Sequence, residues 1–319
     1  MGNLDPIRGE IRVAGFRRVS HGLYLPLSSL GERAEALRDL TAWRLVLPPD
    51  AVFTHVTAAA LAGWWLPQMP AYVPVFAAMP RDSHRPRRPG LVCSRLDRGA
   101  ASERLSHGLP VDTAEEVLLR AARDLALLDF VPMIESALRT GDATRSALEA
   151  LCETGRPGVR RLRLGTALAD VRSESYWETA LRLFHVSVDI PVDSQVELFD
   201  EHGTFLARAD LLLSGTTNVH EYDGGGHRLR EQHAHDLRRE RRLAGKSYVR
   251  RGYTAEDLVR HPLVMLAEID RAIGRRHRPE RIRLWRRWVS ESTVTDGGRR
   301  RLMNRWLHLS GVTDWSQTA

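Results

Sequence analysis

The sequence contains little cysteine and almost no lysine. Its two cysteines, Cys93 and Cys152, lie far apart and match neither a metal-binding nor a redox spacing, so we expect two reduced structural thiols. Of the 47 lysine and arginine residues, only Lys246 is a lysine. The basic excess gives a formal net charge of +7, and arginine is well suited to bidentate phosphate contacts. The composition therefore admits a nucleic-acid partner without requiring one.

Long apolar runs are also missing. Residues 1–15 lack the apolar core of a signal peptide. The most apolar window, residues 51–67, includes His55 and ends at Pro67, which is typical of a buried helix and too short for a bilayer span. We therefore expect a cytoplasmic protein with no membrane partner.

Short strands and helices alternate in the first half of the chain. Residues 16–27 predict two strands around a turn, and the apolar run that follows residue 52 predicts a helix ending at Gly63. Residues 72–80 and 90–96 predict two further strands. Asp112 or Thr113, followed by two glutamates, has the spacing of a capping box and predicts the start of another helix.

A glycine- and proline-containing segment near residues 155–172 predicts a domain boundary. Beyond it the order is helix, three strands, helix, strand and helix. The predicted helices cover residues 175–186, 227–245 and 254–262, and the predicted strands cover residues 192–200, 204–213, 218–223 and 246–251. Residues 263–319 form a basic helical tail rich in tryptophan, whose tryptophans either pack on the body or stack on bases.

Three acidic residues fall on two of these strands. Asp210 lies in a mostly apolar strand, where a carboxylate costs several kcal/mol unless it is paired or bound to a metal. Glu221 and Asp223 share one face of the following strand because side chains alternate. If the two strands are adjacent, the three carboxylates converge and suit Mg²⁺ or Mn²⁺. Glu178, on the preceding helix, could reach the same cluster. The plainer alternatives are a strand-end residue paired with an arginine for Asp210, a solvated edge and an Asp-Gly turn for Glu221 and Asp223, and a surface acid for Glu178.

A very basic segment follows these acids. Its arginines would form either a track for phosphate groups or a solvated helix face. The candidates for nucleic-acid contacts are Arg228, Arg238, Arg242, Arg250 and Arg251.

Residues 173–258 resemble the PD-(D/E)XK nuclease superfamily, and most of all an uncharacterised branch related to very-short-patch-repair endonucleases. The residues that carry the resemblance are Glu178, Asp210, the run Glu221-Tyr222-Asp223-Gly224, His227, Asp236 and Arg239. The resemblance implies a restriction-endonuclease-like mixed sheet flanked by helices. It also implies catalytic roles for Glu178, Asp210, Glu221, Asp223, His227, Asp236 and Arg239, with Asp210, Glu221 and Asp223 as metal ligands. The superfamily's common lysine is replaced here by Asp223.

Residues 16–150 resemble the AbiEi-type antitoxin family of type IV toxin–antitoxin systems, with the winged-helix head truncated. The stretches that carry this resemblance are residues 16–27, 53–65 and 107–122. It implies a partner protein for this part of the chain. Together the patterns predict an α/β (α+β) protein with an antitoxin-like domain (residues 1–160), a nuclease-like domain (161–262) and the basic tail (263–319).

Three functions are compatible with these features. The first is a metal-dependent endonuclease acting on nucleic acid, with DNA favoured, in a defence or toxin–antitoxin role. The second is a non-catalytic regulator that binds DNA through a degenerate nuclease fold. The absence of the superfamily's common lysine supports this alternative. The third is a protein–protein interaction module. Metal-dependent stabilisation would favour the first, and metal-indifferent, salt-sensitive DNA binding the second.

Overall fold

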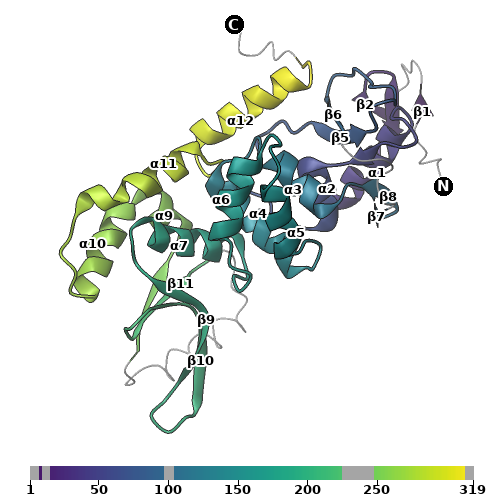
Figure 1. Cartoon of the computed structure of the whole chain (residues 1–319). Helices are drawn as coiled ribbons and strands as arrows, with labels where there is room; N and C mark the ends of the chain where they lie inside the picture. Colours follow the sequence, from purple (N-terminus) through teal and green to yellow (C-terminus); the bar gives the residue numbers. More distant parts are fainter. Residues whose placement is uncertain (1–6, 9–14, 97–103, 225–247, 313–319) are drawn as a thin grey trace, which may run out of the picture. The chain divides into compact units, whose positions relative to one another are not determined.

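The computed structural model describes residues 7–8, 15–96, 104–224 and 248–312. The chain is a mixed α/β protein whose elements are labelled in Figure 1. Its contacts divide it into two compact units. Unit 1 contains residues 1–125, 146–162 and 299–319, and unit 2 contains residues 126–145 and 163–298. These units are interleaved along the chain, whereas the sequence predicted three consecutive segments, 1–160, 161–262 and 263–319. Those segments stay a prediction about independently folding domains.

Unit 1 is built on two small sheets. The first has the strand order β1-β3-β2 and the second the order β6-β5-β4-β8-β7, with parallel pairing of β5 with β6 and of β4 with β8. The strands are β1 (Ile7–Arg8), β2 (Phe16–Ser20), β3 (Leu23–Pro26), β4 (Val52–Phe53), β5 (Val75–Met79), β6 (Leu91–Arg95), β7 (Arg104–Ser106) and β8 (Leu109–Val111). The helices that begin in this unit are α1 (Glu32–Arg44), α2 (His55–Ala62), α3 (Ala114–Ala121) and α6 (Val159–Leu168).

Most local predictions for unit 1 are confirmed. The paired strands β2 and β3 occupy residues 16–26, and β5 and β6 fill the two predicted apolar runs. Helix α2 ends at Gly63, whose φ of 73° lies in the left-handed region that favours glycine. The predicted capping box is wrong: Thr113 is the N-cap of α3, but its side chain makes no capping bond. Asp112 instead accepts a hydrogen bond from the Thr113 amide and pairs with Arg120.

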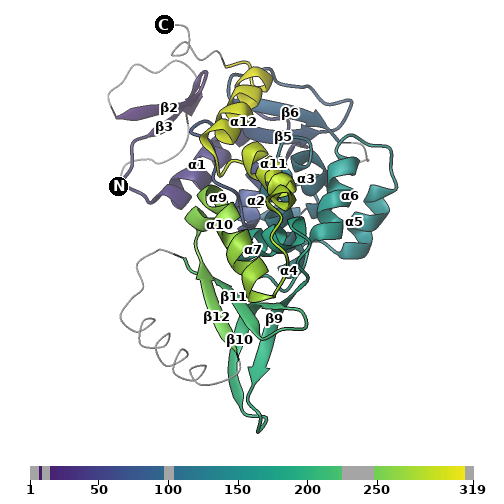
Figure 2. The ribbon, with the colours of Figure 1, turned by 90° about the vertical axis from the view of Figure 1, so that its left-hand side faces the viewer.

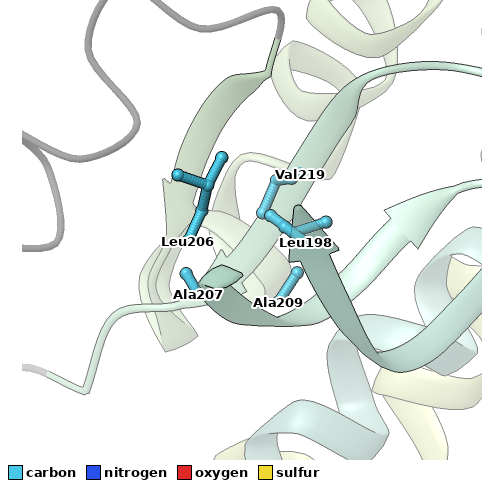
Figure 3. Close-up of a cluster of buried hydrophobic side chains, with 5 residues drawn as sticks. All are labelled: Leu198, Leu206, Ala207, Ala209 and Val219. Atoms are coloured by element: carbon cyan, nitrogen blue, oxygen red, sulfur yellow. The ribbon is translucent and has the colours of Figure 1, made fainter. Parts of the chain in front are cut away.

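Unit 2 contains a four-stranded mixed sheet in the order β12-β11-β10-β9, visible in Figure 2. Its strands are β9 (Val192–Phe199), β10 (Phe205–Leu213), β11 (Asn218–Tyr222) and β12 (Val249–Tyr253). The β9–β10 and β10–β11 pairs are antiparallel, and β11 and β12 are parallel. All four strands were predicted. A cluster of Leu198, Leu206, Ala207, Ala209 and Val219 forms an apolar core on this sheet (Figure 3).

Helix α7 (Tyr176–Ser187) packs on β9 and β11 and against α4 (Leu127–Arg139). Its N-cap is Ser175, whose side-chain oxygen accepts a hydrogen bond from the backbone amide of Glu178. Helix α9 (Ala255–Arg260) begins at the predicted cap Thr254, with a complete capping box to Asp257. The remaining elements are α5 (Arg145–Cys152), α10 (Pro262–Ala272), a 3₁₀ turn at Pro279–Ile282, α11 (Arg283–Glu291) and α12 (Asp296–Leu309).

The C-terminal helices bury their tryptophans. Trp285, Trp288 and Trp306 are at most 7% exposed, and the Trp285 indole donates a hydrogen bond of 2.8 Å to the Leu258 carbonyl. The packing interpretation of these aromatics is therefore confirmed over base stacking. In the part of the chain that the structure describes, no helix combines the length and apolarity needed to cross a membrane.

Candidate functional site

The two strands β10 and β11 bring Asp210 and Glu221 together. Their antiparallel register pairs Leu211 with His220, and one further step places Asp210 opposite Glu221. Residues opposed in this way have Cβ atoms about 5 Å apart. The Tyr222 amide donates a hydrogen bond of 3.1 Å to Asp210 Oδ2, which fixes this carboxylate at the end of the ladder. The predicted convergence of Asp210 and Glu221 is thus supported by strand register.

Arg250 on β12 lies against the acids of β11. Its Nε donates to Glu221 Oε2, and its Nη2 lies 3.4 Å from Asp223 Oδ1. Glu221 is only 3% exposed, so a cationic partner is needed to offset the loss of hydration of its carboxylate. The parallel register explains the geometry, because Arg250 is paired with Val219 and its side chain runs along the face that carries Glu221.

A glycine on β12 leaves room for Asp223. Gly252 is the register partner of Glu221, and a Cβ built on Gly252 would lie 1.6 Å from Asp223 Oδ2. The Asp223 amide also donates 2.8 Å to the Tyr253 carbonyl. No sequence pattern indicated this close approach, because the predicted strand ended at Arg251, one residue before Gly252.

Glu178 is occupied at the start of its own helix. Its Oε2 accepts from the Glu174 amide at 2.8 Å and from Gln195 Nε2 at 3.0 Å, and its Oε1 accepts from Ser175 Oγ. Among the described residues, these bonds join α7 to β9 and do not reach Asp210 or Glu221. Trp177, the preceding residue, stacks on Tyr222 with ring centroids 5.6 Å apart.

A buried histidine pair, which the sequence patterns did not indicate, joins helix α7 to strand β11. His185 Nε2 and His220 Nδ1 are 2.8 Å apart, and both residues are 0% exposed. Burial lowers the pKa of His185 to about 4 and that of His220 to about 2, so both rings are neutral at pH 7. His220 was visible in the sequence as one of several histidines, but its partner on α7 was hidden in an apolar stripe.

Several predicted site residues lie outside the described part of the chain. They are His227, Asp236 and Arg239 of the predicted catalytic set and Arg228, Arg238 and Arg242 of the predicted phosphate contacts. Of the other two candidates for phosphate contacts, Arg250 binds the carboxylates. Arg251 donates a hydrogen bond of 3.2 Å to the Glu268 carbonyl of α10.

The described residues contain no group of three or more histidine, cysteine, aspartate or glutamate side chains placed to hold a metal ion. The predicted three-carboxylate set of Asp210, Glu221 and Asp223 is therefore reduced to the opposed pair Asp210 and Glu221. Such a pair still fits Mg²⁺, which proteins commonly hold through one or two carboxylates, with water and phosphate oxygens completing its coordination. Asp223 is placed instead to hold Arg250.

Comparisons with known proteins add no relative to this picture. A scan against protein-family models found no match. Searches of curated proteins and of solved structures likewise found none.

Proposed function

We propose that unit 2 hydrolyses phosphodiester bonds of nucleic acid in a metal-dependent reaction, with DNA as the first substrate to test. The observation that supports this most is the opposed placement of Asp210 and Glu221 on adjacent strands. These two residues would hold one Mg²⁺ or Mn²⁺. When bound, such a cation polarises the phosphate and lowers the pKa of a water nucleophile. A defence or toxin–antitoxin role would follow only from the resemblance of residues 16–150.

Arg250 supplies the protein's own positive charge at this site. It stands against Glu221 and Asp223, where it can offset charge that the carboxylates would otherwise direct at a phosphate. It thereby compensates for the lysine that the resembled superfamily has at position 223. Asp223 positions the Arg250 guanidinium, and Glu178 fixes the start of α7 beside Gln195.

The test is cleavage of supercoiled, linear and single-stranded DNA, and of single-stranded RNA, by the full-length protein with Mg²⁺, with Mn²⁺ and with chelator. Asp210→Asn and Glu221→Gln keep side-chain size and should abolish cleavage while the protein stays folded. Glu201→Gln, on an exposed turn, is the matched control and should cleave normally. Cleavage that persists in chelator, or in both site variants, would refute the proposal.

A second function has its own support. Arg250 already offsets the negative charge of Glu221 and Asp223. This is expected for a degenerate nuclease fold, which would bind DNA as a non-catalytic regulator. Such a protein would cleave none of the substrates. It would bind DNA equally well with Mg²⁺ and with chelator, and its affinity would fall steeply as salt rises.

A further inference from the structure

Unit 1 contains a cavity of about 170 Å³ whose wall is rich in arginine. The wall comes from the start of α2, from β5 and β6, from the end of α3 and from α12. It carries four arginines, Arg85, Arg120, Arg123 and Arg305, against one carboxylate, Asp124. All of these residues belong to unit 1. This balance of charge suits an anionic ligand.

The Asp124 carboxylate is bound by other residues of the cavity wall. It accepts hydrogen bonds from Arg305 Nε at 2.7 Å and from the Trp306 indole at 3.0 Å, and His55 Nε2 lies 3.2 Å from it. Burial opposes its ionisation, but these partners outweigh that effect and hold the pKa of its carboxyl below the ordinary value. The described residues engage Arg305 only through Nε, so its two Nη groups remain available as donors.

His55 lies beside Asp124 in a strained backbone conformation. Its φ of 54° lies in the left-handed region, which is unfavourable for a residue with a side chain. The ring stacks on Phe76 with centroids 4.1 Å apart, and its Nδ1 accepts a hydrogen bond of 2.8 Å from the Val56 amide, so the neutral ring carries its hydrogen on Nε2. Burial lowers the pKa of His55 and favours the neutral ring. Strained backbone of this kind is concentrated at functional sites.

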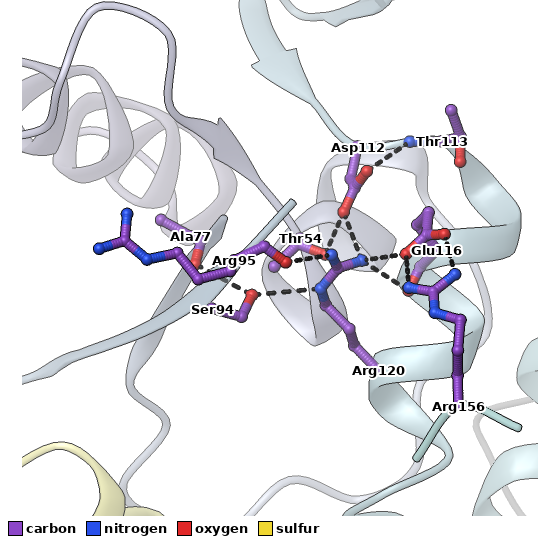
Figure 4. Close-up of polar contacts among 9 residues, drawn as sticks. All are labelled: Thr54, Ala77, Ser94, Arg95, Asp112, Thr113, Glu116, Arg120 and Arg156. Atoms are coloured by element: carbon purple, nitrogen blue, oxygen red, sulfur yellow. Dashed lines mark hydrogen bonds and ion pairs between the residues drawn. The ribbon is translucent and has the colours of Figure 1, made fainter. Parts of the chain in front are cut away.

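Arg120 serves as a structural support of the cavity. It donates to Asp112, to Glu116, to Ser94 Oγ and to the Arg95 carbonyl, as Figure 4 shows. Every nitrogen of its guanidinium is therefore engaged by the protein. The same network joins β6 to α3 at the cavity wall.

Three guanidinium groups remain for a ligand. Arg85 donates Nη2 to the Cys93 carbonyl at 2.8 Å, which anchors the side chain and leaves its other donors. Arg123 is exposed and forms no ion pair with any residue that the structure describes. With Arg305, these side chains surround a space whose carboxylate is already paired. Exposed arginine donors that line one cavity can bind phosphate through several charge-assisted hydrogen bonds.

A wider groove of about 720 Å³ shares Arg85, Cys93 and Leu309 with the cavity. It adds Arg87, Arg88 and Arg95 to the basic surface. The described lining of this groove includes no phenylalanine, tyrosine or tryptophan. A groove of this composition suits phosphates and sugars, and His308 and the arginines are the lining groups that could stack on a base.

We propose that the cavity binds a phosphate monoester group and that the groove takes the rest of the phosphorylated molecule. The phosphate belongs either to a free nucleotide or to the phosphorylated end of a nucleic-acid strand. Both sources present a dianionic terminal group to Arg85, Arg123 and Arg305. This site uses none of the carboxylates of unit 2. The proposed phosphate binding can therefore be tested independently of the proposed hydrolysis.

The test is binding by the full-length protein in chelator, which removes metal-dependent cleavage from the measurement. Fluorescence anisotropy compares a short single-stranded DNA with a 5′-phosphate and the same strand with a 5′-hydroxyl. Competition by AMP is compared with competition by adenosine. The variant is Arg85→Gln/Arg123→Gln. The control, Arg33→Gln/Arg160→Gln, removes the same charge from exposed positions of unit 1 outside both cavities.

The wild type should prefer the phosphorylated strand, or AMP over adenosine, by about tenfold, the effect of one to two charge-assisted hydrogen bonds. That preference should disappear in Arg85→Gln/Arg123→Gln and persist in the control. Preference for the phosphorylated strand without competition by AMP identifies the strand end as the source; competition by AMP identifies a free nucleotide. Equal affinity of the wild type for both members of each pair would overturn the proposal. Equal loss of preference in variant and control would overturn it as well.

Discussion

Arg250 and Glu221 form an ion pair between the neighbouring parallel strands β12 and β11, in which the carboxylate is buried. Glu221 is 3% exposed, while the Arg250 side chain is 21% exposed. The carboxylate is therefore the deeper partner and depends on the guanidinium for compensation. A divalent cation at Asp210 and Glu221 would compete with Arg250 for the same oxygens.

This competition gives the first prediction. Arg250→Gln leaves a buried carboxylate without its cation and should lower the free energy of unfolding by about 2–4 kcal/mol in chelator. Mg²⁺ should then raise the melting temperature more in this variant than in the wild type, because Glu221 is released for the metal. The double variant Arg250→Gln/Glu221→Gln should lose that extra rise. An identical Mg²⁺ response in all three proteins would show that no cation binds at Glu221.

The second prediction concerns Gly252. An alanine there places a Cβ 1.6 Å from the present position of Asp223 Oδ2, so the Asp223 side chain must rotate away from Arg250. Gly252→Ala and Asp223→Asn should each destabilise the protein in urea unfolding. Because both disrupt the same contact, the double variant should be destabilised by less than the sum of the single effects. Strict additivity would mean that Gly252 and Asp223 are not coupled.

The histidine pair gives the third prediction, which concerns pH. Burial lowers the pKa of His185 from 6.5 to about 4. Between these two pH values the unfolded chain binds a proton at His185 that the folded protein does not bind. The stability from the neutral ring is complete above pH 6.5 and is lost as the pH falls from 6.5 towards 4. His185 alone accounts for about 3 kcal/mol of this loss.

The measurement is urea unfolding across this pH window. His185→Leu/His220→Val should flatten the dependence of stability on pH, since neither new side chain titrates. His202→Gln, on an exposed turn, is the control and should keep the slope of the wild type. A double variant with an unchanged slope would refute the assignment of the titration to this pair.

A buried ion pair in unit 2 gives the fourth prediction. Arg182 Nη2 lies 2.5 Å from Glu135 Oε1, and Glu135 is 0% exposed. Arg182→Met should cost about 3–5 kcal/mol, because the remaining carboxylate is buried without a charged partner. Glu135→Leu/Arg182→Met should recover most of that loss.

An exposed ion pair of unit 2, Arg208 and Glu174, serves as the comparison for the buried pair Arg182 and Glu135. Arg208 and Glu174 are 2.8 Å apart but half exposed, so Arg208→Met should cost less than about 1 kcal/mol. Similar costs for Arg182→Met and Arg208→Met would mean that burial does not set the strength of the Glu135 pair. Chemical denaturation of the three variants decides the matter.

The sequence alone predicted the strands of unit 2 because each has a local pattern. Alternation identified β10 and β11, and an Asp-Glu-His-Gly turn separated β9 from β10. The pairing of Arg250 with Glu221 was not predictable in the same way. It depends on the parallel register of β11 and β12, which joins residues 29 apart in the chain. Local patterns assigned Arg250 to phosphate contacts and missed its neighbour.

Long-range packing also hid the arginine cavity of unit 1. Asp124 and Arg305 are 181 residues apart, and the helix that carries Arg305 read in sequence only as part of a basic tail. His55 looked like a polar residue in an apolar helix. Its left-handed backbone and its approach to Asp124 come from tertiary packing against Phe76 and Trp306, which no short window contains.

The most direct test of the acidic site is a count of bound Mn²⁺ by electron paramagnetic resonance, because it measures occupancy without requiring a substrate. Wild type, Asp210→Asn and Glu221→Gln would be titrated at equal protein concentration, after thermal unfolding has shown all three to be folded. The nuclease proposal predicts one bound ion per wild-type chain and loss of that ion in each variant. No bound ion in the wild type, or equal binding in all three proteins, would contradict it and favour a non-catalytic regulator.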